Sequence, residues 1–371
     1  MKKNLKVLLT GFFGNVGMNT LSELLQKGHE VRCFDIETSK NLKMHKKAGD
    51  LGDFEIIWGD ITDYEDVRKA VEGRDAIVHL AGIIPPLSEE IPEVAKKVNV
   101  DGTKNLIQAA KQSPTPPLFV VASSISVYGS TMSQPPPRKV SDELSPLDNY
   151  SSHKVQVEKM IKESGLSYHI LRLAAVSLPK IPNKMDPILF EVPLDQRIEF
   201  VDSRDVGKAF ANALDLEEKN LTFNIGGGKG CQIYQRDYVE SMFNAMGLSM
   251  LPDSAFRVPQ TEDEWFYTDW LDTENSQKLL NYQTISFEDY IEELRDDITW
   301  RRFGAKIVSP FVKLSLLISS PYYKFTKKDE EEFAEFDHKK IQQLTEANSQ
   351  KIEALESKVQ ELEAIIKQLQ S

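Results

Sequence analysis

Short apolar, β-rich runs alternate with helix-period segments through the first 175 residues of this 371-residue chain. Such alternation is typical of βαβ units, which build a parallel sheet covered by helices on both faces. We therefore predict an α/β fold with a Rossmann-type, doubly wound parallel sheet. The predicted strands are residues 5–10, 29–35, 54–59, 75–81, 117–123 and 167–173.

The turn after the first predicted strand reads TGFFGNVG and spans residues 10–17. Gly11 permits a tight turn, Gly14 lets the backbone approach a pyrophosphate, and Gly17 lets the next helix pack close to the strand. The helix N-terminus near Asn15 offers free N–H groups and a positive dipole end to phosphates. This pattern predicts a dinucleotide site; a strand-to-helix turn without a ligand is the alternative.

An acidic residue, Asp35, ends the second predicted strand, 18 residues beyond Gly17. Its carboxylate can accept hydrogen bonds from both hydroxyls of an adenine ribose, and it would repel a 2′-phosphate. No arginine follows it in DIETSK (35–40). NAD is therefore the predicted cofactor, in preference to NADP.

A serine-rich segment and a Tyr-x-x-x-Lys pair follow the fifth predicted strand. SSISVYG covers residues 123–129, and NYSSHK (149–154) opens a helical stretch that places Tyr150 and Lys154 on one face. An ammonium near a phenol favours the phenolate and lowers the tyrosine pKa, so Tyr150 can exchange a proton with an alcohol or ketone. Lys154 can also hold the nicotinamide ribose. A solvated tyrosine beside a solvated lysine is the alternative.

Further motifs occur in a fixed order over about residues 5–300: GDITD (59–63), HLAG (79–82), NVDGTKNL (99–106) and LRLAAV (171–176). With the motifs above, they make the chain resemble extended short-chain dehydrogenases/reductases of the NAD-dependent epimerase/dehydratase family. The resemblance implies a Rossmann domain, a smaller C-terminal substrate domain, and the catalytic residues Ser124, Tyr150 and Lys154. The cofactor-binding residues that it implies are Gly11, Phe13, Gly14, Asn15, Val16, Gly17, Asp35, Asp60, Ile61, Leu80, Ala81, Gly82, Asn99, Tyr150 and Lys154.

Two of these residues have structural alternatives. Asp60, which the resemblance places near the adenine, could instead cap the helix that begins at Asp63. Asn99, which would support the site from its helix, could simply satisfy backbone groups.

The chain departs from the family pattern at two places. The 4,6-dehydratases place an Asp-Glu pair after the catalytic threonine, whereas Ile125 and Ser126 stand here, so dehydratase activity is disfavoured. Family epimerases commonly carry an arginine for the diphosphate in a Gln-x-Arg-Asp-Phe stretch. Here Ile198 takes its place and Arg197 comes one residue early, which favours a smaller or less charged substrate. Arg204 and Arg257 are open as substitutes for that charge.

The segment IIPPLSEE (83–90) is the predicted rim of the substrate site, with Ile84, Pro85, Ser124 and Tyr150 as substrate contacts. Its apolar character favours a partly apolar alcohol or ketone. We predict an NAD-dependent oxidoreductase or epimerase that transfers hydride between NAD and a secondary alcohol or ketone. A nucleotide-sugar 4-epimerase and a non-catalytic, NAD-sensing scaffold are the alternatives.

Composition excludes other classes of protein. A net charge of −12 and a pI near 5.2 argue against a nucleic-acid binder. Two cysteines, Cys33 and Cys231, cannot build a disulfide framework and favour a reducing, cytoplasmic compartment. Six scattered histidines lack metal-ligand spacing, so no metal site is predicted. His79, at the end of a predicted strand, is expected to pack.

The domain prediction has four parts: an NAD-binding Rossmann domain (1–175), a substrate-binding part interleaved with it (176–300), an apolar connector flanked by basic residues (301–328) and a helical coiled-coil tail (329–371). Residues 307–323 are expected either to contact an anionic membrane peripherally or to pack on the enzyme body or a second subunit. The tail heptads favour a parallel homodimer, and a lone helix docked on its own body is the alternative. Positions a and d hold Ile352, Val359, Ile366, Leu355, Leu362 and Leu369.

Overall fold

The computed structural model describes residues 4–177, 188–297 and 312–326. Its larger body is built on a seven-stranded sheet whose strand pairs are all parallel, in the order β3-β2-β1-β4-β5-β6-β9. This sheet confirms the predicted Rossmann-type fold. The strands are β1 (Lys6–Thr10), β2 (Glu30–Asp35), β3 (Glu55–Trp58), β4 (Ala76–His79), β5 (Leu118–Ser124), β6 (Tyr168–Leu173) and β9 (Leu221–Ile225).

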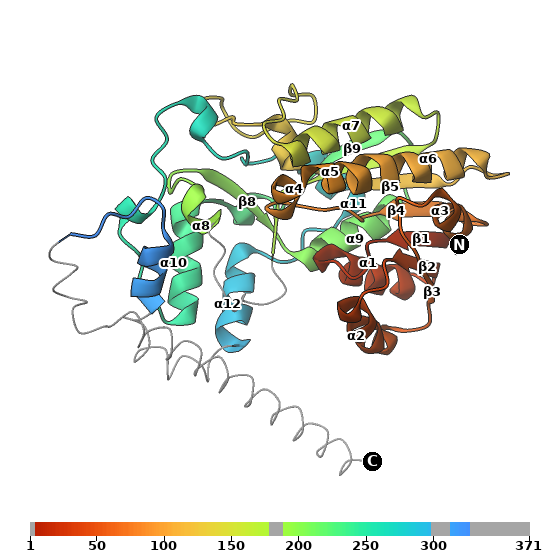
Figure 1. Cartoon of the computed structure of the whole chain (residues 1–371), viewed down its shortest axis with the longest axis horizontal. Helices are drawn as coiled ribbons and strands as arrows, with labels where there is room; N and C mark the ends of the chain where they lie inside the picture. Colours follow the sequence, from red (N-terminus) through yellow and green to blue (C-terminus); the bar gives the residue numbers. More distant parts are fainter. Residues whose placement is uncertain (1–3, 178–187, 298–311, 327–371) are drawn as a thin grey trace, which may run out of the picture.

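Helices cover both faces of the sheet because side chains alternate along each strand. In β1, Val7 and Leu9 join one apolar core, and Leu8 joins the other. The first core packs against α1 (Asn15–Gln26), α2 (Ser39–Ala48), α9 (Ser203–Ala213) and α11 (Glu274–Leu280). The second packs against α3 (Tyr64–Val71), α6 (Gly102–Gln112) and α7 (Asn149–Glu163), as Figure 1 shows.

The direction of winding changes between β1 and β4, because the chain first adds β2 and β3 on one side and then β5 and β6 on the other. Ligands of open α/β sheets bind beyond the carboxyl ends of the strands at such a switch point. The glycine turn after β1 and the segment after β4 therefore meet where a ligand crevice is expected.

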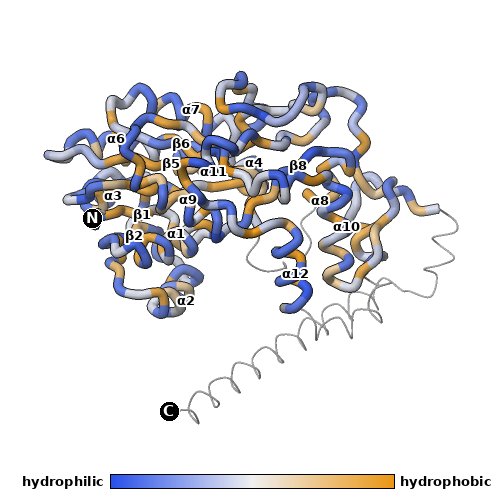
Figure 2. The backbone as a smooth tube through the Cα atoms, turned by 180° about the vertical axis from the view of Figure 1, so that it is seen from behind, coloured by the Kyte–Doolittle hydropathy of each residue, from blue (hydrophilic) through white to orange (hydrophobic). Residues whose placement is uncertain are grey.

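A smaller body lies beside the first (Figure 1). It holds a three-stranded sheet of β7 (Ala175–Val176), β8 (Arg197–Val201) and β10 (Gln232–Tyr234), covered by α10 (Gln235–Met246) and α12 (Phe287–Asp297). Although β9 and α9 fall within residues 176–300, they complete the larger body. Figure 2 shows apolar residues along β1 and β5 and in α10.

Residues 312–326 pack on the smaller body. A helix at 312–319 buries Leu314, Leu316 and Leu317 against an apolar cluster that includes Phe190 and Phe243. Residues 312–326 of the predicted connector therefore pack on the body of the protein, which is one of the two alternatives predicted for this segment. None of the helices in the described ranges is long and apolar enough to span a membrane. The predicted coiled-coil tail lies outside the described residues.

Candidate active site

The glycine turn is shaped by close backbone approaches. Gly11 has a φ of +70°, and a Cβ atom there would lie 2.6 Å from the backbone of Ala81, which follows β4. A Cβ atom on Gly17 would lie 2.5 Å from backbone atoms of Phe12. Gly14 precedes the first residue of α1, and no side chain caps that helix. The N–H groups of its first turn are thus open to an anionic ligand.

Asp35 is held at the end of β2, beside this turn. Its carboxylate accepts hydrogen bonds from the amides of Phe13 (3.3 Å) and Ile36 (2.9 Å) and from the Asn41 side chain (3.3 Å). Burial raises the pKa of Asp35, and the two amide hydrogen bonds oppose that rise. An acid tied by Phe13 to the glycine turn lies where the ribose of a dinucleotide is expected.

The residues present fit NAD on three observations. The backbone at Gly11 and Gly17 approaches other segments so closely that Cβ atoms there would overlap with them. An acid lies at the end of β2, and the N-terminus of α1 has no side-chain cap. Asn15 adds a fourth, because its buried side-chain oxygen has no hydrogen-bond partner within the described part of the chain. Its amide nitrogen donates to the carbonyl of Ser177.

The segment after β4 is held by Asn99. Its side chain donates to the Ile83 carbonyl (2.8 Å) and accepts from the Ile83 amide (2.7 Å). Asn99 thus satisfies backbone groups of Ile83, as the second interpretation of this residue predicts. These hydrogen bonds hold residues 80–83 opposite the glycine turn. His79 lies between the hydroxyls of Thr10 (2.8 Å) and Thr103 (2.9 Å), and burial lowers its pKa to about 3.

Asp60 does not cap the following helix. Asp63 is the residue that caps α3, through the Glu65 amide at 2.8 Å, whereas the Asp60 carboxylate accepts from the Thr62 amide. The capping alternative for Asp60 is therefore wrong. Asn105 of α6 donates to the Ile61 carbonyl at 3.1 Å and so holds this segment against the helix.

The three predicted catalytic residues come together. Ser124 is the last residue of β5, and Tyr150 and Lys154 lie in the first turns of α7, which Asp148 caps through the Ser151 amide (2.7 Å). Ser124 is hydrogen-bonded to Tyr150. The Lys154 ammonium lies 5.5 Å from the centre of the Tyr150 ring and donates to the Ala122 carbonyl at 2.8 Å.

The electrostatics of Tyr150 differ from the expectation. Burial raises its pKa and Asp148 adds to that rise, while the hydrogen bond with Ser124 lowers it. The pKa of Tyr150 in the chain alone thus lies above its ordinary value, and the predicted lowering by Lys154 is not seen. Burial also lowers the pKa of Lys154 to about 8, opposed by the charge of Glu158.

The predicted substrate rim is tied to the catalytic helix by Glu89, which sequence reasoning missed. Its carboxylate accepts from the Asn149 amide (3.2 Å), the Asn149 side chain (2.7 Å) and the amide of Tyr150 itself (3.1 Å). In the same segment, Ile84 is 61% exposed and Pro85 is half-buried. No local pattern identifies Glu89, because its partners lie 60 residues later in the chain.

Tyr267 is a second residue that the sequence did not reveal. Its hydroxyl is hydrogen-bonded to Asp148, which caps α7, and so lies close to the candidate catalytic residues. Burial raises the pKa of Tyr267, and Asp148, Glu89 and Tyr150 add to that rise. Buried Gln196 holds this segment, since its side chain donates to the Thr268 carbonyl (2.7 Å) and accepts from the Phe266 amide (2.9 Å). Tyr267 follows Tyr150 by 117 residues, so no spacing in the sequence links them.

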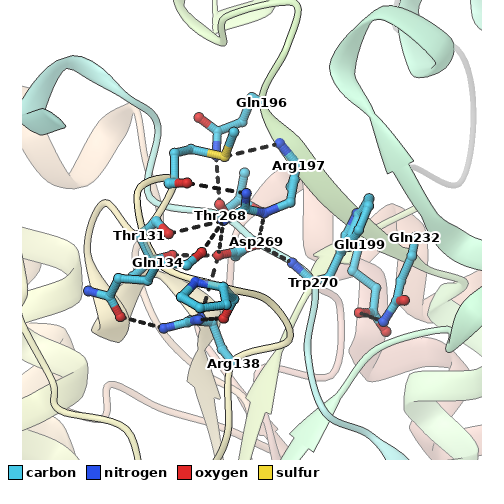
Figure 3. Close-up of polar contacts among 12 residues, drawn as sticks. Thr131, Gln134, Arg138, Gln196, Arg197, Glu199, Gln232, Thr268, Asp269 and Trp270 are labelled. Atoms are coloured by element: carbon cyan, nitrogen blue, oxygen red, sulfur yellow. Dashed lines mark hydrogen bonds and ion pairs between the residues drawn. The ribbon is translucent and has the colours of Figure 1, made fainter. Parts of the chain in front are cut away.

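The arginines considered for a diphosphate all pair with carboxylates of the chain. Arg197 forms a two-pronged ion pair with Asp269 (2.6 and 3.0 Å) and also donates to the carbonyls of Thr131 and Gln134 (3.0 Å each), as Figure 3 shows. Arg204 pairs with Asp202 (2.8 Å) and Glu293 (2.7 Å), and Arg257 lies 3.8 Å from Glu191.

A parallel sheet with a glycine turn, an acid at the end of β2 and a Ser-Tyr-Lys set is typical of nucleotide-binding enzymes of the extended short-chain dehydrogenase type. Residues 7–226 match the model of the NAD dependent epimerase/dehydratase family, and the chain belongs to that family. The family is NAD-dependent, in agreement with the predicted cofactor.

Among curated relatives, a 3-beta-hydroxysteroid dehydrogenase of Mycolicibacterium neoaurum is 41% identical over 129 residues, 33% of each chain. The mouse 3 beta-hydroxysteroid dehydrogenase type 7 is 32% identical over 159 residues, 42% of each chain. The chain thus matches about a third to two fifths of the length of these relatives.

Solved structures share the fold. A UDP-glucose-4-epimerase from Stenotrophomonas maltophila with bound NAD has a TM-score of 0.67 and 20% identity, covering 82% of this chain and 100% of that one. A UDP-glucuronic acid 4-epimerase from Bacillus cereus, in complex with UDP-glucuronic acid and NAD, has a TM-score of 0.66 and 22% identity, covering 80% and 99%.

Proposed function

We propose that the protein is an NAD-dependent oxidoreductase that interconverts a secondary alcohol and a ketone on a partly apolar substrate. The observation that carries the proposal is the convergence of Ser124, Tyr150 and Lys154 at the carboxyl end of β5. In this parallel sheet that end lies on the same edge as the glycine turn after β1 and Asp35 at the end of β2. A hydroxyl, a phenol and an ammonium placed close together can transfer a proton to or from a substrate oxygen.

The proposed roles follow from the contacts of each group. Ser124 holds the substrate oxygen, and Tyr150 accepts the proton of the alcohol or returns one to the ketone. Lys154 holds the ribose of the cofactor and stabilises the phenolate. The chemistry that NAD supplies when bound is acceptance of a hydride from the carbinol carbon, so that the alcohol loses one hydride and one proton.

The substrate class is argued from charge. Arg197, Arg204 and Arg257 pair with carboxylates of the chain, which leaves them poorly suited to a sugar-nucleotide diphosphate. The exposed side chain of Ile84 gives the rim an apolar surface. Relatives named as 3-beta-hydroxysteroid dehydrogenases agree with this direction. A hydroxysteroid-like secondary alcohol is therefore the first substrate class to test.

A nucleotide-sugar 4-epimerase is the second candidate, because solved epimerases share the fold over about four fifths of the chain. It would use the same Ser124, Tyr150 and Lys154. Ile198 in place of the diphosphate arginine weighs against it. Ile125 and Ser126 weigh against a dehydratase, and the complete catalytic set weighs against a non-catalytic scaffold. The homodimer and the cytoplasmic location stay predictions from the sequence.

The test is a substrate panel with a point variant. Wild-type protein is incubated with NAD and either 3β-hydroxysteroids, simpler secondary alcohols, UDP-glucose or UDP-glucuronic acid, while NADH absorbance and products are followed. We expect NADH to form with the apolar alcohols. Tyr150→Phe should lower kcat by at least about 100-fold, because the proton-transfer group is lost, while NAD binding persists.

The control is Tyr64→Phe, which removes a hydroxyl of half-buried Tyr64 in α3 that donates to the Gln112 side chain at 2.7 Å, and it should leave activity unchanged. Epimerised sugar nucleotide without net NADH would replace the proposal by the second candidate. Full activity of Tyr150→Phe would refute acid–base catalysis by this residue.

A further inference from the structure

A buried carboxylate lies one helical turn below the catalytic lysine. Tyr150, Lys154 and Glu158 follow one another at intervals of four residues in α7, so the three share one face of the helix. Glu158 is 1% exposed, which is rare for an acid and requires partners. The role of this residue is not explained by the proposed proton transfer alone.

Glu158 connects the catalytic helix to the catalytic strand. The hydroxyl of Ser123 donates to one Glu158 oxygen at 2.7 Å, and both residues are buried. Ser123 directly precedes Ser124, whose side chain reaches Tyr150. One carboxylate therefore holds the end of β5 against the helix that carries Tyr150 and Lys154.

Arg172 of β6 keeps that carboxylate in place. It binds both Glu158 oxygens, at 2.8 and 2.7 Å, and donates to the Tyr128 hydroxyl at 2.8 Å. Tyr128 in turn donates to the Asn224 side chain of β9 at 2.7 Å. Tyr128 ends the short helical turn that follows Ser124, and Ser123 directly precedes Ser124. The network therefore holds the chain both before and after Ser124. The side chains of Glu158, Arg172, Tyr128 and Asn224 are all buried.

We propose that Glu158 is a positioning residue for the reaction: its carboxylate sets the separation of Ser124 from the Tyr150–Lys154 pair and places a negative charge next to Lys154. The proposal rests on the function proposed above. It differs from a purely structural role because the charge of Glu158, and not only its shape, acts on the site.

The charge matters because Lys154 is buried. Burial lowers its pKa to about 8, and the negative charge of Glu158 opposes that fall and keeps the ammonium form available at neutral pH. Other charged or titratable groups face this pair from each packed element. They are His79 of β4, Tyr150, His153 and Lys162 of α7, Arg172 of β6 and Tyr128.

The experiment separates charge from hydrogen bonding. Glu158→Gln keeps an acceptor for Ser123 but removes the charge, and it should lower the pKa of Lys154 by about one unit. The pH–rate limb that reports Lys154 should move to lower pH by the same amount, with kcat reduced about tenfold and KM little changed. Ser123→Ala removes only the hydrogen bond, so it should lower kcat without moving that limb.

A second measurement is the pKa of Lys154 itself, by NMR titration of lysine-labelled protein, and it needs no substrate. This readout separates the two proposals: if the wild type lacks oxidoreductase activity but the titration shifts, the proposed function fails while the action of Glu158 on Lys154 stands. Glu163→Gln is the matched control on the same helix, because Glu163 is exposed and pairs only loosely with Lys159 (3.9 Å). It should shift neither measurement.

Removal of one buried partner leaves Arg172 unpaired, so Glu158→Gln could unfold the chain. The double variant Glu158→Gln/Arg172→Gln removes both charges and serves in that case. It should fold and shift the Lys154 titration in the same direction but by less than the single variant, because Glu158 is the charge that acts on Lys154 and the loss of the Arg172 charge offsets only part of its removal. An unmoved Lys154 titration in either folded variant would overturn the proposal, as would unchanged kcat in Ser123→Ala.

Discussion

The proposed cofactor side and the proposed substrate side of the candidate active site are constructed differently. On the cofactor side, the glycine turn and Asp35 lie within the first 35 residues, and the backbone amide of Phe13 joins them. On the substrate side, Arg197 pairs with Asp269, 72 residues away, and Gln196 holds Thr268 across the same interval. One side depends on local backbone shape and the other on buried polar side chains from distant segments.

The difference has an energetic consequence. A closely packed backbone turn is destabilised when a side chain is added, because atoms then overlap. A buried ion pair is destabilised when one side chain is removed, because the remaining charge has neither water nor a partner. The two sides should therefore respond to opposite kinds of substitution, which the following variants test.

The largest effect is expected at Asp269, which is 1% exposed and binds Arg197, the Thr131 hydroxyl (2.7 Å) and, at 3.5 Å, Arg138. Asp269→Ala leaves Arg197 without its carboxylate and Arg138 with Asp142 alone (3.4 Å), and it should lower the free energy of unfolding by about 3–5 kcal/mol. Urea denaturation measures this change.

The matched control for that variant is Asp253→Ala. Asp253 also binds an arginine in two-pronged fashion, Arg236 at 2.8 and 2.9 Å, but is 68% exposed. It should cost less than about 1 kcal/mol. Equal losses for the two variants would contradict the idea that burial distinguishes the substrate side.

A smaller effect, of about 1–3 kcal/mol, is expected when a methyl group is added at Gly17 on the cofactor side. Its Cβ atom would lie 2.5 Å from backbone atoms of Phe12, which cannot move aside as a flexible side chain can. If the strain falls on the NAD-binding conformation, Gly17→Ala should weaken NAD binding about 10- to 100-fold, as measured by calorimetry. Gly49→Ala, with no atom within 4 Å of its Cβ position, should bind NAD normally. If Gly17→Ala binds NAD as tightly as the wild type, the glycine turn does not form the proposed NAD site.

The last effect, the smallest when taken per pH unit, is a pH dependence of stability from buried Glu199 of β8. Burial raises the pKa of Glu199 from 4.5 to about 7, although N–H donors of Gly228, Gln232 and Leu271 oppose the rise. Between these values the folded chain binds more protons than the unfolded chain. Stability should therefore decrease as pH rises through this window, by at most about 1.4 kcal/mol per pH unit.

Glu199→Gln should remove that pH dependence, although it also lowers stability at every pH because one donor loses its acceptor. Glu65→Gln, at an exposed position of α3, should keep the wild-type slope. Thermal unfolding between pH 4.5 and 7.5 compares the three proteins. Parallel slopes for wild type and Glu199→Gln would assign the dependence to other groups.

Much of the fold could be read from the sequence because strands and turns are encoded in short windows. All six predicted strands are present, and the Gly11 turn has the positive φ that only glycine adopts readily. The strand β9 was not predicted, although most of its residues, LTFNI, favour strands. Only its pairing with β6 shows that it belongs to the larger sheet. The roles of Ser124, Tyr150 and Lys154 stay predictions, although the structure brings the three together.

By itself, the sequence determined the nucleotide-binding sheet, its glycine turn and acid, and the three groups proposed for catalysis, because each depends on residues close together in the chain. Only the tertiary structure decided that Glu89 reaches the Tyr150 amide, that Tyr267 joins the site and that Arg197 is occupied by Asp269. It also decided that burial raises the pKa of Tyr150. Contacts and desolvation of this kind arise between segments 60 or more residues apart, and no local pattern records which distant side chain will be the partner.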